Sequence, residues 1–209
     1  MMNKFIFREK SIAFLAKKQM YIPTYLPLLD DSSLKNVSDI KKRALTLNAV
    51  VATSFGLQRK KAIDWLVNEG LYDSLTLLEK KYLLSDKDDN NKNFQVKIHC
   101  LFVFSWVLKK YANFNIIDDL PNDLIKKYPD LIASQSSKKI NLKLRDELEL
   151  LQQCDTAYCL DWCFTQEKLI NNSFDSSSII NHTTLKERRR VLEWCLYDDN
   201  DWDDISFDT

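Results

Sequence analysis

The fold is decided by residues 141–170, which read NLKLRDELELLQQCDTAYCLDWCFTQEKLI. Mostly apolar side chains recur in this stretch at alternating steps of four and three residues: Leu144, Leu148, Leu151, Asp155, Tyr158, Trp162, Thr165 and Leu169. Because positions on one face of an α-helix are three or four residues apart, this spacing predicts a long helix with one buried face over the whole segment.

The rest of the chain carries shorter helical patterns. Residues 94–111 are apolar nearly all round and predict a buried central helix, although Val103, Phe104 and Trp106 leave a buried strand as the alternative. A first helix is expected over residues 8–19, a second from the N-cap Ser38 to Gly56, and a short third one that ends at Gly70. Two more helices are expected, one that begins at the capping-box pair Thr76 and Glu79 and one that begins after an N-cap at Thr183 or Thr184.

Glycine is scarce, with only 2 residues in the chain of 209. Tight turns between strands favour residues that adopt positive φ, glycine above all, so a sheet protein of this length is disfavoured. The same scarcity excludes the glycine-rich loops that bind nucleotides. We therefore expect a mostly α fold: residues 1–209 form a single-domain irregular helical bundle around a buried central helix, with little or no β structure.

Neither end of the chain nor its interior carries a targeting signal that we can identify. The apolar run Phe5-Ile6-Phe7 is too short for a signal peptide, and the longest apolar run, from Ile98 to Leu108, is shorter than the roughly 20 residues of a membrane span. The five cysteines are odd in number and lack a disulfide spacing, which is typical of reduced thiols. We predict a cytoplasmic protein that does not associate with a membrane.

The acidic residues are concentrated at the end of the chain. The formal net charge is zero, so nothing attracts the whole chain to nucleic acid, and no nucleic-acid partner is expected. Residues 195–209 hold six acids and no base, which leaves 30 bases and 24 acids in residues 1–194. Trp202 and Phe207 among the acids indicate that residues 195–209 pack on the body. The acids then either meet the positive surface of the body or form an acidic surface for a basic partner, and both can hold if several carboxylates stay outward. The candidates for binding a protein partner are Asp198, Asp199, Asp201, Asp203 and Asp204.

Asp155 stands on the apolar face of the predicted long helix, where a leucine would be expected. A buried carboxylate without a partner is unfavourable, so two interpretations remain open. It is either a site acid with a raised pKa or a structural group, which forms an ion pair with an arginine such as Arg43, Arg188 or Arg189 or a hydrogen bond to the backbone.

Cysteine and histidine form no convincing site. Cys159 and Cys163 lie four residues apart on one predicted helix and could ligate a metal, but only His99 and His182 are available as histidine ligands. Free cysteines usually behave as small buried hydrophobes, His99 fits a core position, and His182 is expected to contact solvent or cap a helix. We therefore expect no metal, no cofactor and no catalytic residue.

Short segments spread over nearly the whole chain carry a family resemblance. They are Arg8 with Ser11, Leu26-Pro27, Arg43-Ala44-Leu45 with Leu47, Ser105-Trp106-Val107-Leu108, Asp155 with Tyr158 and Trp162, Glu187-Arg188-Arg189 with Leu192 and Trp194, and the ending Trp202-Asp203-Asp204 with Asp208-Thr209. With these residues, the ending being the most specific, the chain resembles the bacterial domain of unknown function DUF4272. It departs from the family in having no glutamate near Lys97.

The resemblance implies a mainly helical, cytosolic bacterial protein and supplies no reaction. A polar core shared with the family would include Asp155, Glu187, Arg188, Trp202 and Asp208.

The sequence leaves two hypotheses about the function. The first is a non-catalytic protein-binding module, specifically an immunity protein that neutralises a cognate bacterial toxin by direct binding, since an acidic surface would attract a basic toxin domain. The alternative is a small enzyme or a metal- or ligand-binding domain that uses Asp155, Arg188 and the tail carboxylates, which hard cations prefer as ligands. The lack of a catalytic constellation favours the first.

Overall fold

The structure is a computed structural model that describes residues 2–85, 91–137, 143–170, 179–197, 201–205 and 207. All regular elements in these residues are α- or 3₁₀-helices, and none of the residues described here lies in a β-strand. The prediction of a mostly helical fold is therefore confirmed. Of the helices in the described ranges, none combines the length and the apolar character needed to cross a membrane.

The chain divides into two compact units. The first consists of Met1–Leu34, Phe114–Asp118 and Arg145–Thr209, and the second of Lys35–Asn113 and Asp119–Leu144. The expectation that residues 1–209 form one domain stays a prediction.

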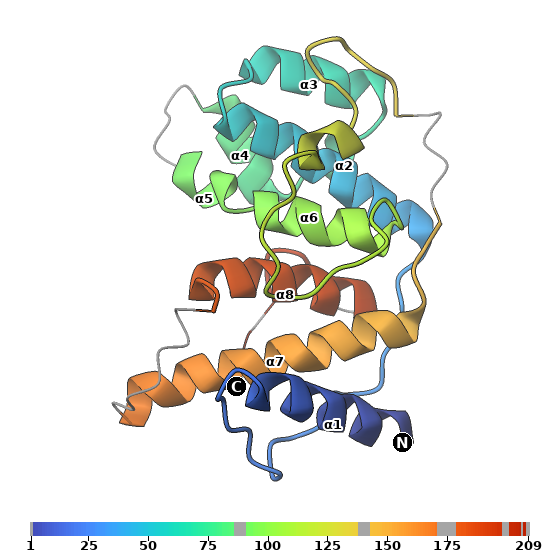
Figure 1. Ribbon diagram of the computed structural model, residues 1–209. Coiled ribbons are helices and arrows are strands. Elements are labelled where there is room, and N and C mark those ends of the chain that lie inside the picture. The colour runs from blue at the N-terminus through green and yellow to red at the C-terminus, as the bar shows by residue number, and fades with distance from the viewer. Residues whose placement is uncertain are drawn as a thin grey trace. The chain divides into compact units, whose positions relative to one another are not determined.

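The first unit is built from three helices, α1 (Met2–Ala16), α7 (Glu147–Ile170) and α8 (His182–Leu196). Helix α7 packs against both of the others and lies between them (Figure 1). The helix predicted over residues 141–170 is thus confirmed from Glu147 onward. Glu147 and Glu149 in its first turn place negative charge at the positive end of the helix dipole.

Helix α7 is buried on more than one face because it has a helix on either side. The predicted apolar face is only partly buried, since Leu148 is 47% exposed while Leu151 and Asp155 are buried. Other buried side chains of α7 lie off that face: Leu150, Cys154, Ala157, Leu160 and Asp161. The predicted single buried face therefore includes only part of the side chains of α7 that are buried.

Asparagines cap two helices whose caps were expected to be serine or threonine. The Asn181 side chain accepts hydrogen bonds from the backbone N–H groups of Thr183 and Thr184 (2.9 and 3.4 Å), so these threonines lie in the first turn of α8. Asn36 likewise replaces Ser38 as the cap of α2. Asparagine is as good an N-cap as serine, so residue type alone could not identify which of two nearby residues is the cap.

Helix α2 (Val37–Ser54) is the centre of the second unit (Figure 1). It contacts α3 (Arg59–Asn68), the 3₁₀-helix η1 (Tyr72–Ser74), α4 (Leu77–Leu84), α5 (Asn91–Gln95) and α6 (Ile98–Val107), and the 3₁₀-helix η2 (Leu124–Lys127) packs on α6. Gly56 and Gly70 follow α2 and α3 with φ of 104° and 69°, a left-handed conformation that suits glycine and ends both helices where the sequence predicted.

The apolar segment 94–111 is helical, which decides against the buried strand. It is interrupted, because α5 ends at Gln95, α6 runs only from Ile98 to Val107, and Lys109 has a positive φ of 54°. Within α6 the residues from Cys100 to Val107 are all buried, as predicted. One further boundary is wrong: the first helix begins at Met2, well before the expected residue 8.

Candidate functional site

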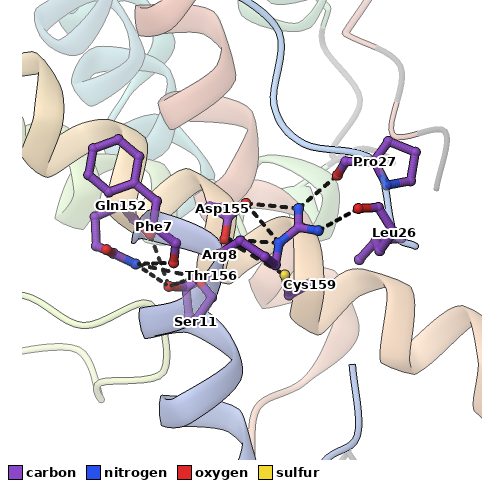
Figure 2. Close-up of polar contacts among 9 residues, drawn as sticks. All are labelled: Phe7, Arg8, Ser11, Leu26, Pro27, Gln152, Asp155, Thr156 and Cys159. Carbon is purple, nitrogen blue, oxygen red and sulfur yellow. Dashed lines mark hydrogen bonds and ion pairs between the residues drawn. The ribbon is translucent and has the colours of Figure 1, made fainter. Parts of the chain in front are cut away.

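A buried ion pair between Arg8 of α1 and Asp155 of α7 is the centre of the candidate site in the first unit (Figure 2). Arg8 Nη2 lies 2.9 Å from Asp155 Oδ1, and Arg8 Nε lies 3.2 and 3.3 Å from the two carboxylate oxygens. The two side chains are only 6% and 2% exposed. The carboxylate on the apolar face is thus paired, but the expected partners Arg43, Arg188 and Arg189 are wrong.

The Arg8 guanidinium also holds the chain that follows α1. Its Nη1 donates to the carbonyl oxygen of Leu26 at 2.6 Å, and its Nη2 donates to that of Pro27 at 2.7 Å. Figure 2 shows the guanidinium between these carbonyls and the carboxylate of Asp155. One side chain therefore ties α1, the Leu26-Pro27 segment and α7 together.

Next to this pair lies a small layer of hydroxyl and amide groups from the same two helices (Figure 2). The hydroxyl groups of Ser11 and Thr156 are 3.0 Å apart, and Gln152 Nε2 donates to Ser11 Oγ at 3.2 Å and to the Phe7 carbonyl at 3.3 Å. These polar atoms form hydrogen bonds to one another across the α1–α7 contact, so they hold the same two helices together as the Arg8–Asp155 pair does.

A second buried network, which the sequence reasoning missed, joins α7 to α8 through Asp161. Asp161 Oδ2 accepts from Arg189 Nη1 at 2.6 Å, and Arg189 Nε lies 2.5 Å from Glu193 Oε1. Burial raises the pKa of Glu193, although the neighbouring Arg189 favours its charged form. The four-residue spacing of Arg189 and Glu193 is a helical pairing signal that was available in the sequence. Asp161 lies outside the predicted apolar face of the long helix, so its burial could not be inferred from the spacing of apolar residues.

His182 belongs to this second network. Its Nε2 lies 2.5 Å from Asp161 Oδ1, and its ring stacks on Phe164 with centroids 4.5 Å apart. His182 was expected to contact solvent or to cap a helix. Its side chain is 20% exposed, but the cap of α8 is Asn181. The imidazole instead covers the carboxylate from the N-terminal turn of α8.

The residues assigned by resemblance to a shared polar core have different partners. Arg188 is 2% exposed and its Nη1 donates to the Ile116 carbonyl at 2.6 Å, while Glu187 Oε2 lies 3.3 Å from Arg190 Nε. Asp155 is bound by Arg8, as described above. The Arg188 bond joins α8 to the segment Phe114–Asp118, whereas the Glu187–Arg190 contact lies within α8. Asp208 lies outside the described residues.

The cysteines are buried thiols. Burial raises the pKa of Cys154 and Cys159 well above the usual range and that of Cys163 to about 12. Cys159 Sγ donates to Asp155 Oδ2 at 3.8 Å, as a protonated thiol does. Because the thiolate is the form that attacks electrophiles and binds metals, these thiols are poor nucleophiles. His99 is half-buried, and in the described parts of the chain no group of three or more His, Cys, Asp and Glu side chains is arranged to hold a metal ion.

We expect the native thiols to react slowly with iodoacetamide at pH 8. Labelling of Cys154, Cys159 and Cys163 should be about 100-fold slower than in the urea-unfolded chain, because burial removes both access and the thiolate. Peptide mass spectrometry over a time course measures each rate, and the unfolded chain is the control. Rapid labelling of Cys159 in the folded protein contradicts this account of the site.

The acidic ending alternates between buried apolar and exposed acidic side chains. Trp202 is 4% exposed and packs edge-to-face on Trp194, with ring centroids 5.7 Å apart, and Ile205 is also buried. Arg190 Nη1 donates to the Trp202 carbonyl at 3.0 Å. The intervening acids are exposed: Asp201, Asp203 and Asp204. The other two partner-binding candidates, Asp198 and Asp199, lie outside the described residues.

Lys110 in the second unit is another group that the sequence reasoning did not single out. Burial, together with the charges of Lys41 and Lys127, lowers its pKa to about 8. Its Nζ donates to the Lys127 carbonyl at 2.6 Å and lies 4.3 Å from the centroid of the Tyr128 ring. Such burial depends on tertiary packing, and no spacing in the sequence predicts it.

The comparison with known proteins finds one family. The family described as domain of unknown function (DUF4272) matches residues 7–205, which span nearly the whole chain. No curated protein and no solved structure matches the chain.

Proposed function

The chain belongs to the DUF4272 family, and we propose that it is a non-catalytic protein-binding module: a bacterial cytoplasmic immunity protein that neutralises a cognate toxin by binding it. The alternation of buried and exposed side chains at the ending supports this role most directly. Trp202 and Ile205 are buried, while Asp201, Asp203 and Asp204 point their charge to the outside.

This alternation distinguishes residues 201–205 from a flexible acidic tail. The two buried side chains and the bond from Arg190 to the Trp202 carbonyl hold the backbone in place, so the carboxylates are presented from an ordered surface. An ordered surface loses less conformational entropy on binding than a flexible one. Exposed acids also speed the association of a basic partner and disfavour acidic ones.

The interior of the first unit supports a binding role over a catalytic one. Asp155, Asp161 and Glu193 each bond to an arginine, and the thiols beside them are protonated. The alternative of an enzyme or metal site built on Asp155, Arg188 and the tail carboxylates has less support, because Arg8 occupies the Asp155 carboxylate and Arg188 is directed to the Ile116 carbonyl.

Neutralising the exposed acids is expected to weaken binding of the partner. The partner to test is a basic toxin domain, sought first among the products of the neighbouring genes and titrated calorimetrically at low and at physiological salt. The triple variant Asp201→Asn/Asp203→Asn/Asp204→Asn should bind about tenfold more weakly and show a smaller salt dependence, since exposed charges at an interface act mainly through steering.

A matched control removes three exposed acids elsewhere: Glu9→Gln, Asp73→Asn and Asp119→Asn. This control should bind like the unaltered protein. Equal weakening by both triple variants would mean that only net charge matters, and unchanged binding by the Asp201/Asp203/Asp204 variant would remove the ending from the interface.

A further inference from the structure

A pocket of about 850 Å³ opens in the second unit between α2 and residues 125–135. Helix α2 contributes Asn48, Val51, Ala52 and Phe55, which follow one another at helical spacing and so share one face. The volume falls in the range of about 300–1,000 Å³ typical of small-molecule sites, and most of the lining is apolar.

Asn48 is the polar group at the inner wall of this pocket. It is only 4% exposed and is one of the pocket-lining residues that α2 contributes. A side-chain amide both donates and accepts hydrogen bonds, so it can pair with a hydroxyl or carbonyl group of a ligand. Because Asn48 shares a face with Val51 and Ala52, such a group would meet it inside the pocket.

The rim of the pocket is positively charged and apolar. Lys61 and Lys126 are exposed at the rim, whereas the carboxylate of Asp130 is engaged as an acceptor for the backbone N–H groups of Ile132 and Ala133 at 2.8 and 3.1 Å. Exposed large apolar side chains complete the rim: Phe55, Ile125 and Ile132. A ligand that suits these features has an apolar body and a negative end.

We propose that this pocket binds a small amphiphilic anion. Its apolar body lies against Val51, Ala52 and Tyr128, a hydroxyl or carbonyl group within the body pairs with the Asn48 amide, and its anionic head lies near Lys61 and Lys126. This site is in the second unit and goes beyond the proposed function, which rests on the ending of the first unit.

The experiment is a calorimetric titration of the full chain with ten-carbon probes: decanoate, decan-1-ol, and hydroxydecanoates whose hydroxyl lies at successive carbons. We expect saturable binding of decanoate at one site and weaker binding of decan-1-ol. At least one hydroxydecanoate should bind about tenfold more tightly than decanoate, which is the effect of one well-placed hydrogen bond.

Variants locate the site. Ala52→Phe should fill the pocket and abolish binding of every probe, with an unchanged helical circular dichroism spectrum as the check on folding. Lys61→Glu/Lys126→Glu should weaken the binding of decanoate about tenfold and leave the binding of decan-1-ol unaffected, because only decanoate has a negative charge that pairs with the lysines. Lys81→Glu, an exposed lysine on α4, is the matched control and should change nothing.

Asn48→Leu tests the inner wall. It should remove the preference for the hydroxylated probe while decanoate still binds. The proposal is overturned if no probe binds saturably, if folded Ala52→Phe binds as well as the unaltered chain, if the double lysine variant binds decanoate normally, or if the preference for the hydroxyl is absent or survives Asn48→Leu.

Discussion

Asp155→Ala is expected to lower the free energy of unfolding by about 3–5 kcal/mol, the usual loss when one partner of a buried ion pair is removed. The substitution leaves the Arg8 guanidinium buried without its counter-charge, although the carbonyls of Leu26 and Pro27 still accept from it. Urea denaturation followed by circular dichroism measures the change.

Two further variants show whether the loss comes from the pair. The double variant Arg8→Met/Asp155→Leu replaces both partners with apolar groups. It should lose less stability than Arg8→Met alone or Asp155→Leu alone, because each of these leaves one buried charge without its partner. Asp201→Ala, at an exposed carboxylate, should change the stability by less than about 0.5 kcal/mol. If Asp155→Ala is as stable as the unaltered protein, Asp155 does not tie α1 to α7 and its role as a site acid reopens.

Glu79→Ala is expected to have an effect of similar size in the second unit. The Glu79 carboxylate lies 2.5 Å from Arg43 Nη2, and both side chains are buried. The same carboxylate accepts from the Thr76 backbone N–H at 3.0 Å and so completes the capping box of α4. Losing the ion pair and the cap together should reduce the free energy of unfolding by about 3–5 kcal/mol.

Two milder substitutions separate these contributions. Thr76→Ala removes the side-chain cap alone and should lose about 1 kcal/mol. Glu79→Gln keeps an acceptor for the Thr76 N–H but removes the charge beside Arg43, so its loss should lie between those of Thr76→Ala and Glu79→Ala. An order in which Thr76→Ala is the most damaging variant would contradict the importance of the Arg43–Glu79 pair.

Local features of the chain were predictable from sequence because they depend on neighbours. The capping box of Thr76 and Glu79 and the helix ends at Gly56 and Gly70 are set within a few residues, and all are confirmed. The long helix α7 was also recognisable from its spacing alone.

The partners of buried charges were not predictable, because they come from distant parts of the chain. Arg8 and Asp155 are 147 positions apart, and nothing in the local sequence selects Arg8 over Arg43 or Arg188. Asp161 was missed for a related reason: a periodicity argument assumes one buried face, whereas α7 has helices on two sides. The inward direction of Asn48 likewise depends on what covers the face of α2 that carries it.

We propose that the exposed acids of the ending bind and neutralise a basic toxin while the buried charges hold the first unit together. A protection assay tests this proposal most directly: cells express a basic toxin domain that a neighbouring gene encodes, with this protein or with its Asp201→Asn/Asp203→Asn/Asp204→Asn variant at equal level. We predict survival with the unaltered protein and reduced survival with the variant. Death of the cells that carry the unaltered protein, with no complex between the two proteins, would contradict the account.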